Sequence, residues 1–285
     1  MNIPKFSINT WLFGKASMKM IVEAASEIGV DGIDISGEPS SIDLNETKDM
    51  LIQHDLIPFC INGNFTDEQR AICHSDEIKR ASAVLYCKEL VDMAVALGSK
   101  RVLIVPSQVN HLDFFVDKET DFLHASQSLK EIAEYAGMRD EEICILIECV
   151  NQYEVAFIRT VKDGIELAES TGCNNIRIVP DTFHMQLEET VGIPNAIRSA
   201  GNHWVKHLHL GDNTREVPGK GCMDWREFLI AIDDIGYEDA LSFEPLPGKL
   251  TGDEIFAGKL DMDLLISDLK YSLAFLKSVC AGIRC

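Results

Sequence analysis

Short apolar runs alternate with longer amphipathic segments along the whole chain of 285 residues. Each run is bounded by Gly, Pro, Asn or Asp, which is typical of strands that are buried on both faces of a parallel sheet. The pattern predicts strands at Phe6–Trp11, Gly32–Ile35, Ile57–Cys60, Arg101–Val105, Ile143–Glu148, Ile176–Pro180, Val205–Leu210 and Ala240–Glu244.

The segments between these runs carry apolar residues at helical spacing, and several end at a glycine, which favours helix termination. We expect helices at Met18–Ile28, Asp76–Leu97 and Thr120–Ala136, one that closes with Ala231–Ile235, and a last one at Leu264–Val279. Gly29, Gly98, Gly137 and Gly236 are expected to end the first four. A strand followed by a helix, repeated eight times, predicts an α/β protein with a closed (β/α)8 TIM barrel.

The alternative architecture is an open doubly wound sheet, which normally carries a glycine-rich phosphate-binding turn after its first strand. The sequence there is Leu12-Phe13-Gly14-Lys15, which lacks that pattern. No internal repeat or flexible linker interrupts the chain, so residues 1–285 are expected to form one domain. The longest irregular stretch, Pro247–Asp261, is compatible with a lid over a site or with a contact between subunits.

The chain carries a formal net charge of -20. Nucleic acid and anionic membranes bind through exposed Lys and Arg, so this charge argues against both as partners. The nine cysteines are odd in number and lack CxxC spacing, which is typical of a reducing compartment. The N-terminus lacks signal-peptide features, and no apolar run approaches the roughly 20 residues of a membrane span. We therefore expect a soluble cytoplasmic protein.

Four polar residues stand at the ends of predicted strands five to eight: Glu148, Asp181, His209 and Glu244. The carboxyl ends of barrel strands form the face where TIM-barrel chemistry takes place, so these side chains are expected to converge. One imidazole and three carboxylates favour a hard or borderline ion such as Mn²⁺, Mg²⁺ or Co²⁺. Structural zinc is disfavoured, because no cysteine lies where it would complete a thiolate site.

Three further residues follow these ligand candidates closely and fall in the loops above them: Glu154, His184 and Arg215. A neutral histidine and a charged arginine beside a metal can stabilise a developing enolate oxygen. Each of the three also has an ordinary structural explanation, as a solvated residue, a packed loop histidine or a surface ion pair.

Two more assignments concern residues near the strand ends. Trp11 and Phe13 are expected to close the first strand and to form an apolar wall for a sugar ring. His207 and His209 are assigned to opposite faces of their strand, so that His209 reaches the mouth and His207 serves as a packing or supporting residue.

Four segments together carry a resemblance to a known family: IECVNQYE, PDTFHMQLEE, HLHLGDNTREVPGKGCMDWRE and the final FEP. They resemble the ketose 3-epimerases of the D-tagatose 3-epimerase and D-psicose (allulose) 3-epimerase family, which belongs to the xylose-isomerase-like, or AP-endonuclease-family-2, barrels. The resemblance implies that Glu148, Asp181, His209 and Glu244 bind one Mn²⁺-like ion per subunit. It also implies that Glu154, His184 and Arg215 contact the substrate, and that the protein is a homodimer or homotetramer.

The resemblance implies a metal-dependent epimerase that acts on the carbon beside a sugar ketone. Glu148 and Glu244 would remove and return a proton through a cis-enediolate. The runs VPSQVN after the fourth strand and CINGN after the third depart from the aromatic and less amide-rich pattern of those enzymes. The substrate therefore stays open between a free ketose and a larger sugar.

Alternatives on the same barrel are a lyase on 3-keto-glycosides, similar to the C-glycoside deglycosidases, and an isomerase of inosose-type ketones. An abasic-site endonuclease is disfavoured by the charge and by the few histidines. A sugar-binding barrel with a vestigial site is the non-enzyme alternative.

Overall fold

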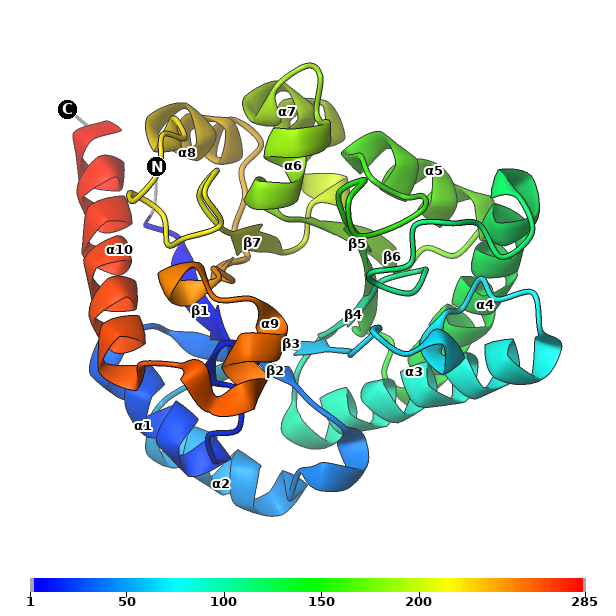
Figure 1. The fold of residues 1–285 in the computed structure, drawn as a ribbon, viewed down its shortest axis with the longest axis horizontal. Helices are drawn as coiled ribbons and strands as arrows, with labels where there is room; N and C mark the ends of the chain where they lie inside the picture. Colours follow the sequence, from blue (N-terminus) through cyan, green and yellow to red (C-terminus); the bar gives the residue numbers. More distant parts are fainter. Residues whose placement is uncertain (1–2, 284–285) are drawn as a thin grey trace.

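The computed structural model describes residues 3–283 and shows eight parallel strands in one sheet, in the order β6-β5-β4-β3-β2-β1-β8-β7. Isolated bridges pair Ile178 with Val205 and Asp181 with His209, which joins β6 to β7 and nearly closes the barrel (Figure 1). The predicted TIM barrel is confirmed. The strands are β1 Lys5–Asn9, β2 Gly32–Ser36, β3 Ile57–Asn62, β4 Arg101–Ile104, β5 Cys144–Cys149, β6 Ile176–Pro180, β7 Leu208–Leu210 and β8 Ala240–Phe243.

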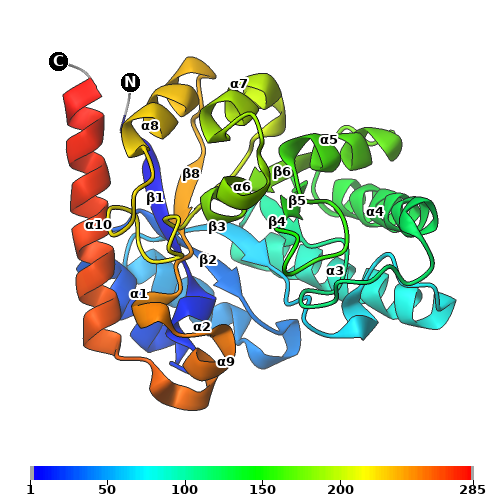
Figure 2. The same ribbon diagram turned by 45° about the horizontal axis from the view of Figure 1, so that its top comes forward.

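Helices surround the strands, as both ribbon views show (Figures 1 and 2). The C-terminal helix α10 packs beside α8 and α1, so the last helix lies next to the first on the outside of the barrel. The helices are α1 Met18–Ile28, α2 Leu44–Gln53, α3 Glu77–Leu97, α4 Lys118–Arg139, α5 Val161–Ser170, α6 Thr182–Glu188, α7 Ile193–Trp204, α8 Trp225–Asp234, α9 Gly252–Glu254 and α10 Met262–Ile283. Within residues 3–283, no helix combines the length and hydropathy that a membrane span requires.

Polar side chains fill part of the barrel interior. Asp34 on β2 lies against His207 just before β7, although β2 and β7 are not neighbours in the sheet. Their contact therefore crosses the inside of the barrel. Ser7 on β1 and Ser242 on β8 are also fully buried, at paired positions of adjacent strands.

The first strand is shorter than predicted, and this changes the position of Trp11. β1 ends at Asn9, and Thr10–Phe13 form a 3-10 turn, so Trp11 and Phe13 do not lie in a strand. The reason is local: the side chain of Asn9 accepts a hydrogen bond from the Trp11 backbone N–H and caps the turn.

The predicted irregular stretch after β8 also has regular structure. It folds into a 3-10 turn at Pro247–Lys249, the short helix α9 and a π-helical turn at Ile255–Lys259. Ile255 is buried, and its carbonyl oxygen would lie 2.9 Å from a Cβ placed on Gly14. The segment therefore packs against the loop that follows β1.

Helix α4 continues through Gly137 to Arg139, so the prediction that Gly137 ends this helix is wrong. Gly137 does not have a positive φ. The helix ends before Asp140, whose backbone N–H donates to the Ala136 carbonyl. Gly98, in contrast, ends α3 in the left-handed conformation, with φ of 83°.

Gly137→Ala is therefore expected to stabilise the protein by about 0.5–1 kcal/mol, because alanine lowers the backbone entropy of the unfolded chain. The nearest atom to the added Cβ is Asn175 Nδ2 at 3.9 Å, so the methyl group fits. Urea denaturation measures the change in the free energy of unfolding. Gly98→Ala is the matched control and should destabilise the protein, because residue 98 has a left-handed φ. A loss of stability in Gly137→Ala would contradict the prediction, because it would show that α4 ends at this glycine.

Candidate metal centre and active site

The four ligand candidates lie together at the open end of the barrel. Glu148 is on β5, Asp181 directly follows β6, His209 is on β7, and Glu244 directly follows β8. One ligand atom from each residue lies within 4.8 Å of those of the other three. This convergence follows from the parallel sheet, in which all carboxyl ends of the strands reach the same rim.

The imidazole of His209 lies between two of the carboxylates. Its Nδ1 is 2.5 Å from Glu244 Oε2 and 3.2 Å from Glu148 Oε1. Burial, reinforced by the charges of Glu244 and Asp181, raises the pKa of Glu148 to about 7. Burial acts to lower the pKa of His209, but the surrounding carboxylates outweigh it and raise this pKa well above its ordinary value.

A divalent cation fits this donor set. Three carboxylates in a buried space repel one another, and a cation between them removes the repulsion. Oxygen ligands with one imidazole suit Mn²⁺, Mg²⁺ or Co²⁺ better than thiolate-bound zinc. The four residues can therefore hold one metal ion.

Glu244 is held by two residues of the first βα loop. Asn9 Nδ2 and Trp11 Nε1 both donate to Glu244 Oε1, at 2.7 and 2.6 Å, which leaves Oε2 facing His209. Asn9 is itself oriented by the Ser36 hydroxyl, which donates to Asn9 Oδ1. The sequence analysis missed Asn9, although its place at the end of the first strand is the signal that identified the other residues. Contact between Trp11 and a sugar stays a prediction.

Asp181 is fixed by the start of α6. Its Oδ1 accepts hydrogen bonds from the backbone N–H groups of Phe183 and His184, at 2.6 and 3.1 Å. The carboxylate caps the helix, and the helix N-terminus in turn favours its negative charge. The same turn places the His184 side chain next to the candidate metal site.

Glu154, His184 and Arg215 lie in one hydrogen-bonded group, joined by Asn151. Asn151 Nδ2 donates to Glu154 Oε1 at 3.0 Å and lies 2.7 Å from His184 Nδ1, while Arg215 pairs with Glu154 at 2.6 Å. The Asn151 side-chain oxygen accepts from the Tyr153 backbone N–H, which fixes the orientation of the amide. The sequence analysis did not identify Asn151, which stands three residues after Glu148.

This arrangement defines the protonation of His184. An amide NH₂ can only donate, so His184 Nδ1 accepts, and the ring proton is on Nε2. Burial lowers the pKa of His184 to about 4, so the ring is neutral near pH 7. A neutral imidazole with a free Nε2–H is a hydrogen-bond donor for a substrate oxygen.

Arg215 is held in an unusual backbone conformation, with φ of 61°. A left-handed arginine costs about 1–2 kcal/mol, and tertiary contacts compensate for this cost. Its guanidinium lies 4.7 Å from the centre of the Phe183 ring, and its backbone N–H donates to the Asp212 carbonyl. Both contacts orient the guanidinium towards Glu154, with which it forms an ion pair.

The loop after β7 is organised by the buried carboxylate of Asp212. It accepts hydrogen bonds from the backbone N–H groups of Gly219 and Met223 and from the Trp225 indole. A Cβ on Gly221 would lie 2.1 Å from Asp212 Oδ1, so this position requires glycine for the close approach. The loop that carries Arg215 is thus a fixed structure.

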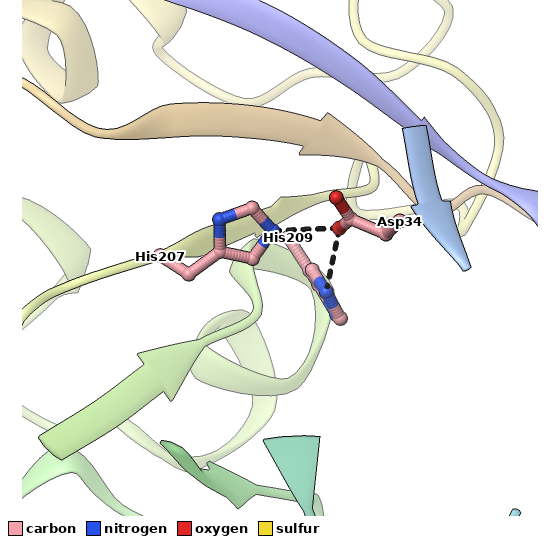
Figure 3. A group of neighbouring side chains, drawn as sticks. All are labelled: Asp34, His207 and His209. Carbon is pink, nitrogen blue, oxygen red and sulfur yellow. Dashed lines mark hydrogen bonds and ion pairs between the residues drawn. The ribbon is translucent and has the colours of Figure 1, made fainter. Parts of the chain in front are cut away.

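The assignment of His207 and His209 to opposite faces is wrong. Residues two apart on a strand point to the same face, and both imidazoles contact Asp34 inside the barrel (Figure 3). His207 comes two residues before His209 and is therefore farther from the rim formed by the carboxyl ends of the strands. Its expected place as a supporting residue beside the site is compatible with this geometry.

The chain matches the family model of the xylose isomerase-like TIM barrel over residues 22–260. It belongs to that family. It is 29% identical over 239 residues to the D-psicose 3-epimerase of Ruminiclostridium cellulolyticum, a match that covers 81% of this chain and 79% of the relative. It is 34% identical over 174 residues to the D-psicose 3-epimerase of Agrobacterium fabrum, covering 59% of each protein.

The fold agrees with a solved relative over nearly its whole length. The crystal structure of a D-psicose 3-epimerase with D-tagatose, from Clostridium cellulolyticum H10, superposes with a TM-score of 0.85 at 25% sequence identity. The superposition covers 96% of this chain and 99% of that one.

The depressed pKa of His184 predicts a pH-dependent contribution to stability. The unfolded ring, with an ordinary pKa of 6.5, binds a proton before the folded ring, whose pKa is about 4. The stability that neutral His184 contributes is therefore present above pH 6.5 and is lost as the pH falls towards 4, by up to about 1.4 kcal/mol per pH unit.

The comparison variant is His184→Asn, whose amide occupies the place of Nδ1 beside Asn151 and does not titrate. Urea denaturation in EDTA gives the free energy of unfolding of both proteins at several pH values. The wild type should lose stability relative to the variant between pH 7 and 4. A difference that stays constant over this range would show that the folded imidazole titrates normally.

Proposed function

We propose that the protein is a metal-dependent sugar epimerase that inverts the carbon beside a ketone, with a ketose as substrate. The observation that carries the proposal is the pair of glutamates, Glu148 and Glu244, which flank one imidazole at the barrel mouth. The similarity to D-psicose 3-epimerases over most of the chain supports the reaction class.

In this proposal Glu148, Asp181, His209 and Glu244 hold one ion per subunit, Mn²⁺ by preference and Mg²⁺ or Co²⁺ as alternatives. Such an ion, when bound, would polarise the ketone and the neighbouring hydroxyl, which would make the C–H of the hydroxyl-bearing carbon more acidic. The protein would be cytoplasmic and would assemble as a homodimer or homotetramer.

The two glutamates carry the proton. One carboxylate removes the proton from the carbon beside the ketone to give a cis-enediolate, and the other returns a proton to the opposite face. Each such step contributes about 10²–10⁴-fold to the rate. The hydrogen bonds from Asn9 and Trp11 hold the Glu244 carboxylate in one orientation for this transfer.

The loop residues bind and stabilise the substrate. The Nε2–H of neutral His184 and the guanidinium of Arg215 donate to the developing oxyanion, each lowering the barrier by roughly 3 kcal/mol. Glu154 accepts from substrate hydroxyls and holds Arg215 in place. Trp11 would provide an apolar surface for the sugar.

A second candidate is a reaction on a larger or more polar ketone, as in a 3-keto-glycoside lyase or an inosose isomerase. Asn62 at the end of β3 and Ser107 after β4 have buried polar atoms without hydrogen-bond partners among residues 3–283. These groups would suit additional substrate hydroxyls on that side of the mouth. In the lyase, the same proton removal would be followed by loss of a β substituent, which leaves as the aglycone; the isomerase would lose none.

The test is the exchange of substrate hydrogen with solvent. In D₂O with Mn²⁺, the wild type should incorporate deuterium at carbon 3 of D-fructose or D-psicose as the two interconvert. Glu148→Gln and Glu244→Gln keep an oxygen ligand but cannot accept the proton, so exchange should fall by at least about 10²-fold. NMR or mass spectrometry measures the incorporation.

Glu169→Gln, on the exposed surface of α5, is the control and should exchange like the wild type. Exchange retained in both site variants would contradict the two-base scheme. Incubation with 3-keto-glycosides separates the epimerase from the lyase, because only a lyase releases the aglycone.

A further inference from the structure

A buried carboxylate lies directly beneath His209. Asp34, His207 and His209 are all 0% exposed; Asp34 is on β2, and it faces His209 on β7 and His207 just before it (Figure 3). Asp34 Oδ2 lies 2.6 Å from His207 Nε2 and 3.6 Å from His209 Nε2. The three residues form a column that ends at the metal site.

The spacing identifies this group as a hydrogen-bonded support. The 2.6 Å between Asp34 Oδ2 and His207 Nε2 is typical of a charge-assisted hydrogen bond. His207 therefore donates its Nε2–H to Asp34 and holds the carboxylate in place.

The position of Asp34 bears on which nitrogen of His209 carries the proton. An imidazole that binds a metal is neutral and keeps its proton on the other nitrogen. Nδ1 of His209 faces Glu148 and Glu244, and Nε2 faces Asp34. With a cation between Nδ1 and the two glutamates, the negative charge of Asp34 at 3.6 Å would favour the remaining proton on Nε2, although this distance exceeds a hydrogen bond.

The buried polar groups of Asp34 and His207 are unfavourable for the stability of the fold. Asp34 Oδ1, His207 Nδ1 and His209 Nε2 are buried without hydrogen-bond partners among the described residues. A protein with buried charges and half-satisfied polar groups is usually less stable than one with apolar residues of the same volume in their place. Conflicts of this kind between stability and local chemistry concentrate at functional sites.

We propose that Asp34 and His207 are a positioning pair that keeps the proton of His209 on Nε2 and so presents the Nδ1 lone pair to the metal ion. This inference rests on the proposed metal site. Asp34 acts on His209 through its charge, and His207 acts by fixing Asp34. Neither residue touches the substrate.

The experiment measures Mn²⁺ affinity by equilibrium dialysis. Asp34→Asn removes the charge with little change in shape, and His207→Leu removes the hydrogen bond; each should weaken Mn²⁺ binding by about 10–100-fold. His207→Gln places an amide N–H near the position of Nε2 and should restore most of the affinity. Asp121→Asn, at a buried carboxylate that binds the backbone of Phe115 and Val116, is the control for general destabilisation and should bind Mn²⁺ normally.

A second measurement needs no variant. ¹⁵N NMR of the wild type loaded with diamagnetic Zn²⁺ should show His209 bound through Nδ1 with the proton retained on Nε2. Binding through Nε2, or an unchanged Mn²⁺ affinity in Asp34→Asn, would overturn the positioning role while the metal site stands. A wild type that binds no Mn²⁺ would instead overturn the proposed function, and this inference with it.

Discussion

The mutual repulsion of Glu148, Asp181 and Glu244 around a single imidazole is the constraint on which the rest of the site depends. Three carboxylates do not remain ionised in a buried space unless a positive charge lies among them. The imidazole of His209 lies among them, and these carboxylates outweigh its burial and raise its pKa well above the ordinary value, which favours the imidazolium. A divalent ion would take over the same function and release the proton.

Contacts within the barrel hold the side chains of the proposed metal ligands in place. Three of the four ligands have a second contact that limits their movement: Glu244 binds Asn9 and Trp11, Asp181 caps α6, and His209 faces Asp34. The loop residues are fixed in the same way, because Asn151 connects Glu154 with His184 and Asp212 organises the turn before Arg215. The site is therefore preorganised by hydrogen bonds within the protein.

The sequence predicted the eight strands, because buried parallel strands leave short apolar runs that a one-dimensional pattern records. It also placed Glu148, Asp181, His209 and Glu244 at one rim, since this needs only the strand ends and the rule that parallel strands share an edge. Local chemistry was less predictable. β1 is shorter than predicted because the side chain of Asn9 caps the turn that follows it. Helix α4 is longer than predicted and ends where the backbone N–H of Asp140 donates to the Ala136 carbonyl.

The residues that the sequence analysis missed act across the fold. Asn9, Asp34 and Asn151 each contact a site residue that is far away in the chain, on another strand or loop. Their residue types are common in turns and strand ends, so residue type alone does not distinguish them; Asn9 does share the strand-end position that identified the four ligand candidates. The error over His207 was different, because the period of two along a strand already places it on the face of His209.

The most direct test of the central claim is a crystal structure of the protein grown with Mn²⁺, with anomalous scattering measured at the manganese absorption edge. We expect one anomalous peak per chain, within bonding distance of Glu148, Asp181, Glu244 and Nδ1 of His209. A peak elsewhere, or between Asp34 and His207, or no peak at saturating Mn²⁺, would contradict the claim that these four residues form the metal centre.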